Sequence, residues 1–300
     1  MAGTVARADR PITRFEPALM RRKVTGTIFY GACLAAVGLL LLALIALLTD
    51  VFLRAAPWLD VDFLTGVPSS RPARAGILPA LVGTLEIGVI VGLVTFPIGV
   101  AAAIYLVEYA ADSRLNRLLQ TNISNLAGVP SIVYGILGLA LFVRTLAMGR
   151  TVLAAALTLS LLILPVVIIA SVEALKAVPQ AQREGAYALG ATRWQMVRRS
   201  ILPAAAPGIM TGIILAMARA IGEAAPLILI GAFAFVTFLP SPFEGQYTVV
   251  PIQIFDWARR PQDDFQGISA AAIVVILGLM LVLNGLALVV RARLSRHIQW

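Results

Sequence analysis

Six long runs of apolar residues restrict the folds open to this chain. A membrane-spanning helix needs about 20 predominantly apolar residues to cross a hydrocarbon core roughly 30 Å thick, and each run reaches that length. Because lipid offers no partner to unpaired backbone groups, such runs must form helices rather than open strands. With 60% hydrophobic and only 13% charged residues, the chain is expected to be an all-α integral membrane protein with six transmembrane helices. The expected helices cover residues 27–49, 77–107, 123–146, 151–175, 208–236 and 268–290.

The distribution of basic residues predicts how these helices are oriented. Residues 1–26 form a polar, Arg-rich tail, and residues 27–296 form the membrane domain. With both termini in the cytoplasm, the cytoplasmic side holds 16 Lys and Arg residues and the opposite side holds 7, while Arg219 falls inside the fifth helix. Cytoplasmic loops of membrane proteins carry the excess of Lys and Arg. We therefore expect a cytoplasmic tail and a multi-pass protein with both termini in the cytoplasm.

The inventory of residues excludes several classes of function. No G-x-x-x-x-G-K-[ST] sequence is present, so the chain does not bind nucleotide through a P-loop. A single cysteine, Cys33, and a single histidine, His297, exclude an internal disulfide, a soft metal site and a Ser–His–Asp triad. The net charge is +9, and the Arg residues behind it lie at the edges of the apolar runs. They form no basic face of the kind that binds nucleic acid. We expect no cofactor and no metal, and transport or conduction remains as the leading function. A membrane enzyme using Glu86 and Glu223 is an alternative.

The segment between the fourth and fifth expected helices, residues 177–206, reads as two short helices joined by a turn. Gly190 stands where a helix would end on a left-handed residue. Thr192 and Gln195, three residues apart, form a capping-box pattern that begins the second helix. That helix carries an apolar stripe formed by Trp194, Val197 and Ile201. A cytoplasmic loop with an apolar stripe and no core of its own is expected to dock on a partner. A hairpin that lies on the bilayer surface is the alternative.

This segment resembles the coupling loop of ABC importer permeases. Their motif reads E-A-A, three residues, G, nine residues, I-x-L-P. The chain matches it, with the spacing intact, at Glu184, Ala186, Gly190, Leu202 and Pro203. It departs at Gly185, where the motif has Ala, and at Ser200, where it has Ile. The resemblance implies the ABC type I importer permease (MetI-like) architecture, in which this loop fits a groove on a separate ATPase subunit. The chain itself is then a transport subunit and not an enzyme.

Two further stretches resemble the phosphate importer permeases, and more the PstA branch than the PstC branch. They are residues 125–135, NLAGVPSIVYG, and residues 218–226, ARAIGEAAP. The resemblance implies transport of inorganic phosphate across the bacterial cytoplasmic (inner) membrane. It also implies three partners: an ATPase of the PstB type, a second permease of the PstC type and an extracytoplasmic phosphate-binding protein of the PstS type. A permease for sulfate or molybdate is the alternative, and an ATP-independent transporter is a more distant one.

Three charged residues lie well inside the expected membrane helices, away from the helix ends. Arg219 is 11 residues beyond Gly208, or roughly 16 Å into the bilayer at 1.5 Å per residue, where an Arg costs about 2.5–3.5 kcal/mol. Glu223 follows at i+4 on the same helical face, and Glu86 is expected at comparable depth. We expect Arg219 to line the translocation path and to offer its guanidinium to an oxyanion, with Glu223 holding it in place. The alternative is a buried ion pair that fixes helix packing.

Overall fold

The structure is predominantly helical. This computed structural model describes residues 19–111, 113–243 and 245–295, and no β-strand occurs within those ranges. Five of the described segments are long and apolar enough to cross a membrane, and a bent pair of shorter helices brings the number to six if it counts as one span. The all-α membrane fold expected from the sequence is confirmed. The five segments are α1 (Leu19–Ala55), α3 (Leu78–Ile104) continued by η3 (Tyr105–Tyr109), α6 (Val152–Lys176), α8 (Arg193–Met196) continued by η5 (Val197–Ile201) and α9 (Leu202–Gly222), and α12 (Asp263–Ser295).

The chain divides into two units, residues 1–50 and 51–300. The first unit contains most of α1, and no side chain from residue 20 to residue 50 is buried. Helix α1 begins at Leu19, earlier than the apolar run that starts at residue 27, because the basic residues before the run are good helix formers and extend it. Residues 1–18 of the expected tail lie outside the described residues.

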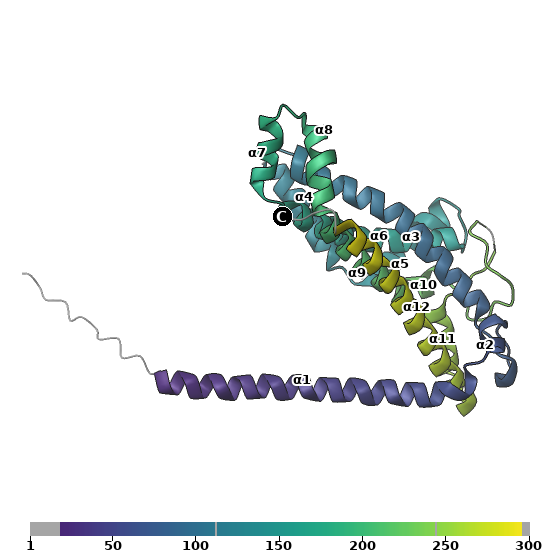
Figure 1. The fold of residues 1–300 in the computed structure, drawn as a ribbon. Helices are drawn as coiled ribbons and strands as arrows, with labels where there is room; N and C mark the ends of the chain where they lie inside the picture. The colour runs from purple at the N-terminus through teal and green to yellow at the C-terminus, as the bar shows by residue number, and fades with distance from the viewer. Residues whose placement is uncertain (1–18, 112, 244, 296–300) are drawn as a thin grey trace, which may run out of the picture. The chain divides into compact units, whose positions relative to one another are not determined.

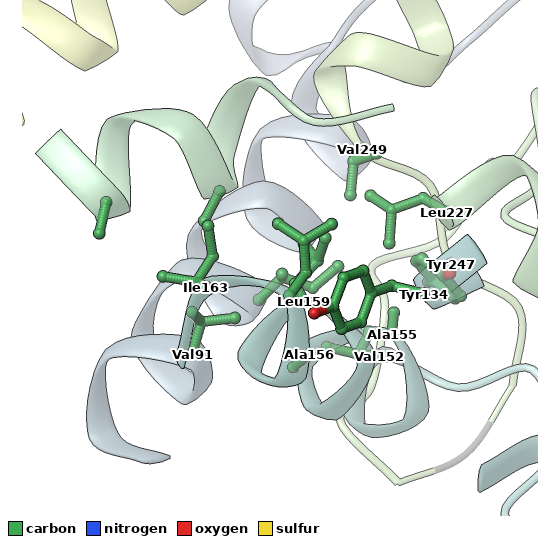
Figure 2. Packing of buried hydrophobic residues seen from close by; sticks show 14 of the residues in the cluster. Val91, Tyr134, Val152, Ala155, Ala156, Leu159, Ile163, Leu227, Tyr247 and Val249 are labelled. Atoms are coloured by element: carbon green, nitrogen blue, oxygen red, sulfur yellow. The ribbon is translucent and has the colours of Figure 1, made fainter. Parts of the chain in front are cut away.

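Helix α6 lies at the centre of the second unit and packs against both α3 and α9. Small residues bring these helices close together: a Cβ atom on Gly208 of α9 would lie 2.9 Å from the Cβ of Ala174 on α6. Close approach at small residues is the usual way in which membrane helices pack. Figure 2 shows the ring of Tyr134 in the core that α6 helps to form, beside α6 residues Val152, Ala155 and Leu159.

The two ends of the second unit carry different elements. Helices α7 (Gln180–Ala188) and α8 lie at one end, and α2 (Val61–Thr65) and α11 (Val250–Ala258) lie at the other (Figure 1). The short turns η1 (Ala56–Trp58) and η2 (Pro72–Arg74) flank α2. At this end the rings of Phe63 and Trp257 are 6.0 Å apart. With its amide oriented to satisfy both partners, Gln253 accepts a hydrogen bond from Trp257 Nε1 at 3.1 Å. The expected coupling segment therefore lies at the opposite end from α2 and α11.

The third expected helix is not a single helix. Residues 123–146 were expected to be continuous, but the chain forms α4 (Arg114–Ala127) and α5 (Ser131–Gly138), which meet at 98°. Helix α5 continues as the π-helical turn η4 (Leu139–Thr145). The break lies at residues 128–130, where Pro130 disfavours a helical conformation for the residue before it. Gly128 ends α4, and its N–H donates to the Asn125 carbonyl at 3.1 Å.

The predicted bounds of the fifth helix, residues 208–236, are wrong at both ends. The helix begins at Arg193 and runs without a break through η5 into α9, which ends at Gly222. The Leu202 N–H donates to the Val197 carbonyl in the wider turn η5, immediately before Pro203, which has no N–H to donate. After a short extended segment the chain forms α10 (Ala225–Ile230), which Gly231 ends in a left-handed conformation with φ of 94°.

Candidate functional site

Arg219 and Glu223 are brought together at the end of α9. Arg219 lies in the last turn of the helix, and its Nε is 4.0 Å from Glu223 Oε2. The two side chains are 45% and 20% exposed, respectively. No hydrogen bond joins the Arg219 guanidinium to any residue in the described part of the chain. The terminal amino groups of Arg219 therefore remain free to bind a planar or tetrahedral oxyanion.

Glu223 does not belong to the helix, contrary to the sequence-based expectation. It follows the last helical residue and has an extended backbone, with φ of −84° and ψ of 114°. A glycine directly before it and Pro226 three residues later are both residues at which helices end. The pairing at i+4 persists because the chain turns only after the Cα of Gly222, so the carboxylate still reaches back to Arg219.

Glu86 lies on α3 beside the same end of α9. A Cβ atom on Gly88 would lie 3.8 Å from the side chain of Ile221, and one on Gly92 would lie 3.8 Å from that of Met217. Going from Gly88 to Gly92 on α3 therefore corresponds to going back from Ile221 to Met217 on α9, so the two helices are antiparallel here. Glu86, two residues before Gly88, then lies level with Glu223, two residues after Ile221. Within the described residues, Glu86 Oε2 is buried and has no hydrogen-bond partner. The structure thus brings Glu86 to the Arg219 region without giving it an ion pair.

The two stretches that resemble phosphate permeases pack against each other. A Cβ atom on Gly135 would lie 2.7 Å from Pro226 Cα and 3.0 Å from the Pro226 carbonyl oxygen. The Tyr134 hydroxyl donates to the Leu126 carbonyl at 3.0 Å and so spans the break between α4 and α5. The stretches are therefore one structural element: α5 supports α10, and with it the segment that carries Glu223. Sequence reasoning identified both stretches but missed this contact.

The coupling segment has the local structure expected from its sequence. The Gln195 N–H donates to Thr192 Oγ1 at 3.3 Å, the Thr192 N–H donates to Gln195 Oε1 at 2.9 Å, and Gly190 has φ of 77°. Glu184 and Gly185 lie exposed on α7, Ala186 is partly buried, and Leu202 and Pro203 begin α9.

The apolar stripe on the second coupling helix is only partly available to a partner. Val197 and Ile201 are fully buried within this chain, packed against α6 and the end of α3. The expectation that the loop has no core of its own is therefore wrong for these two residues. The large apolar side chains of the segment that remain exposed are Trp194, at 56%, Leu189, at 90% beside the turn, and Tyr187, at 45%.

Sequence reasoning also missed an ion pair between the coupling segment and the membrane helices. Arg183 of α7 is paired with Glu108 of η3, 75 residues earlier in the chain, at 2.8 Å. Neither residue belongs to a motif with a recognisable spacing, so no local signal pointed to the pair.

Comparison with known proteins identifies the class to which this fold belongs. A chain of a bacterial ABC transporter involved in the import of the acidic polysaccharide alginate superposes with a TM-score of 0.65, over 92% of this chain and 98% of that one, at 17% identity. A chain of the MetNI methionine ABC transporter, in an inward-facing conformation, gives a TM-score of 0.55 over 75% of this chain and 95% of that one, at 18% identity. At these identities the likeness concerns the fold alone, which is the MetI-like architecture of ABC importer permeases.

Sequence comparison identifies the family. The family described as “Binding-protein-dependent transport system inner membrane component” matches residues 63–296, and the chain belongs to it. The phosphate transport system permease protein PstA 1 of Mycobacterium tuberculosis (strain H37Rv) is 33% identical over 279 residues, which are 90% of this chain and 89% of that protein. PstA of Mycobacterium leprae is 34% identical over 282 residues, 90% of each chain. The probable ABC transporter permease protein YqgH of Bacillus subtilis is 37% identical over 202 residues, which span only 64% of each chain. The chain is thus a multi-pass transport subunit of a binding-protein-dependent importer.

Proposed function

We propose that this chain is the PstA-type permease subunit of an ABC importer that moves inorganic phosphate across the bacterial cytoplasmic membrane. The observation that carries the proposal is Arg219, a half-exposed guanidinium at the end of a membrane helix with one loose contact, 4.0 Å from Glu223. Two PstA proteins of mycobacteria, similar over about nine-tenths of this chain, support phosphate as the substrate.

In this proposal, Arg219 binds the passing phosphate and Glu223 limits how tightly it does so. A guanidinium presents paired N–H groups that match two phosphate oxygens, and it stays charged at any pH of interest. At 4 Å and an effective dielectric constant of about 20, the attraction of Glu223 is at most about 4 kcal/mol. Phosphate must compete with that attraction, and Glu86, level with Glu223, places a second carboxyl group beside the guanidinium. Binding is therefore transient, as transport requires.

The proposed partners fit the two ends of the second unit. Helices α7 and α8 would face the cytoplasm, where Leu189 and Trp194 present apolar surface to an ATPase of the PstB type. The coupling residues would be Glu184, Gly185, Ala186, Gly190, Leu202 and Pro203. The end that carries α2 and α11 would face a phosphate-binding protein of the PstS type (Figure 1). A second permease of the PstC type would complete the path, and both termini would be cytoplasmic.

Uptake of radiolabelled phosphate, normalised to the amount of assembled complex, tests the role of Arg219. Arg219→Gln removes the charge and should abolish uptake while the complex persists. Arg219→Lys keeps a point charge but loses the paired geometry, so it should retain part of the activity. Lys176 is the control, because it pairs with Glu173 at 3.5 Å, both side chains are exposed, and neither residue belongs to the proposed path or docking surfaces. Lys176→Gln should transport at the wild-type rate.

A packing role for the pair makes the opposite prediction. If Arg219 only neutralises Glu223, then Arg219→Gln should lower the amount of complex because it leaves a carboxylate unpaired. The double change Arg219→Gln with Glu223→Gln should then restore both assembly and uptake. A double variant that takes up phosphate normally would refute the proposed role of Arg219, and a wild-type complex that prefers sulfate or molybdate would refute the substrate.

A further inference from the structure

The end of α3 and the coupling helix α7 are joined by a nearly buried ion pair. The Arg183 Nε donates to Glu108 Oε1 at 3.1 Å, and Arg183 Nη2 donates to the same oxygen at 2.8 Å. The side chains of Arg183 and Glu108 are only 13% and 5% exposed. A charge-assisted contact of this kind is short and directional, and its burial shields it from screening by salt. It differs in this respect from the exposed pair of Glu173 and Lys176, 3.5 Å apart at the end of α6.

Arg183 also holds the end of α6. Its Nη1 donates to the Val178 carbonyl at 2.8 Å, and its Nη2 donates to the Leu175 carbonyl at 2.9 Å. The last carbonyl groups of a helix lack partners within the helix and carry partial negative charge, which a cation stabilises. A single side chain of α7 is thus bound to both α3 and α6, the two membrane helices that pack along each other in the core.

The second coupling helix contacts the same turn of α3. The guanidinium carbon of Arg193, the first residue of α8, lies 5.6 Å from the ring centroid of Tyr109. A cation at this distance from an aromatic ring is attracted by it. Tyr109 directly follows Glu108 in η3. Adjacent residues of one π-helical turn therefore contact both coupling helices.

Helix α3 connects this turn to the Arg219 region. It carries Glu86 near one end and Glu108 just beyond the other, 22 residues apart in the sequence and so about 33 Å apart along a helix. At Gly88 and Gly92, α3 lies in van der Waals contact with α9 beside Arg219. A shift of η3 along the axis of α3 would therefore move Glu86 relative to the end of α9.

We propose that Glu108 and Arg183 are positioning residues that transmit movement of the ATPase-docking helices through α3 to the phosphate path. The proposal rests on the proposed function for its readout. Movement of α7 pulls on η3 through the ion pair, and α3 carries the displacement to Glu86. When the link is removed, the ATPase should still dock and hydrolyse ATP, but hydrolysis should no longer drive transport efficiently.

The test measures phosphate moved per ATP hydrolysed in proteoliposomes that contain the complete complex and the phosphate-loaded binding protein. Glu108→Gln keeps the shape of the side chain and removes its charge, and Glu173→Gln is the matched control at the same end. We expect the Glu108→Gln complex to retain its bound ATPase and to move roughly fivefold less phosphate, or less still, per ATP hydrolysed. Fivefold is the lower end of the range typical of energetic coupling between distant sites. Glu108→Asp should recover part of the ratio, and Glu173→Gln should leave it unchanged.

Other outcomes overturn the proposal. An unchanged ratio in an assembled Glu108→Gln complex would show that the pair does not transmit movement. If this variant fails to assemble, the double change Glu108→Gln with Arg183→Gln removes the unpaired charge and is measured instead. A wild-type ratio in the double variant, or its failure to assemble, would assign the pair a structural role only. If the wild-type complex does not take up phosphate, the proposed function fails. The link between Glu108 and Arg183 can then still be tested by measuring how far the binding protein stimulates ATP hydrolysis in each variant.

Discussion

Replacing Gly135 by alanine tests whether the contact between α5 and α10 supports the segment that carries Glu223. The new Cβ atom would lie 2.7 Å from Pro226 Cα and 3.0 Å from its carbonyl oxygen. Carbon atoms normally approach to about 3.5–4.0 Å, so α5 and α10 must separate by about 1 Å. Both obstructing atoms are backbone atoms, which cannot rotate out of the way as a side chain would.

The expected loss of stability follows from two opposing terms. Overpacking a tight contact costs about 1–3 kcal/mol, and replacing Gly by Ala in a helix recovers about 0.5–1 kcal/mol. The two terms together span about 0–2.5 kcal/mol, and we expect a net loss near the middle of that range, about 1 kcal/mol. Thermal melting of the purified protein in detergent measures it, since 1 kcal/mol shifts the midpoint of a domain of this size by about 2–4 °C. Phosphate uptake should fall as well, because Pro226 lies three residues after Glu223.

Gly185→Ala is the matched control for this prediction. A Cβ atom at Gly185 would meet no atom within 4 Å, and the change raises helix propensity in α7. The melting midpoint of this variant should equal or slightly exceed that of the wild type. If Gly135→Ala melts at the same temperature as Gly185→Ala, the close packing of α5 on α10 is refuted.

Three further predictions concern other parts of the chain. A reporter active only outside the cytoplasm should be silent when fused at the C-terminus and active when inserted near Gly245; the reverse pattern would overturn the orientation. Glu184→Lys and Gly190→Pro should leave the protein inserted but reduce co-purification with the ATPase, since one reverses a charge on α7 and the other replaces a residue with φ of 77°; normal co-purification in both variants would contradict the docking role. Trp257→Ala should lower the free energy of unfolding by about 3–5 kcal/mol, because the side chain is fully buried beside Phe63; a melting midpoint equal to the wild type would contradict that packing.

The membrane helices could be predicted from the sequence because their signal is local. An apolar run of sufficient length leaves few alternatives in lipid, and the ends of α6 differ from the expected ones by a single residue. Hydropathy alone does not register changes of direction. The break between α4 and α5 lies within an apolar run, and its signal was the pair of Gly128 and Pro130, which turn a chain regardless of polarity.

The candidate site was only partly predictable. Arg219 stood out because a charge within an apolar run is costly and therefore has a role. The spacing of Glu223 suggested its partner, although the helix ends one residue before it. In contrast, the pairing of Arg183 with Glu108 joins residues 75 positions apart. Such pairs depend on how the helices assemble, and no periodicity in a single sequence records that.

The helix that runs from Arg193 to Gly222 would make axial twist a second way to move Arg219, the anion-binding residue of the proposed function. Arg193 and Arg219 stand on one rod, separated by about 39 Å at 1.5 Å per residue. Rotation of one end about the helix axis is carried toward the other end, less the twist absorbed in the π-helical turn η5. Side chains extend about 6 Å from a helix axis, so a 20° turn of the docking end would sweep the guanidinium through roughly 2 Å. A displacement of that size would change the 4.0 Å separation between Arg219 and Glu223, so under the proposed function a twist at the α8 end would alter how strongly Glu223 competes with phosphate for the guanidinium.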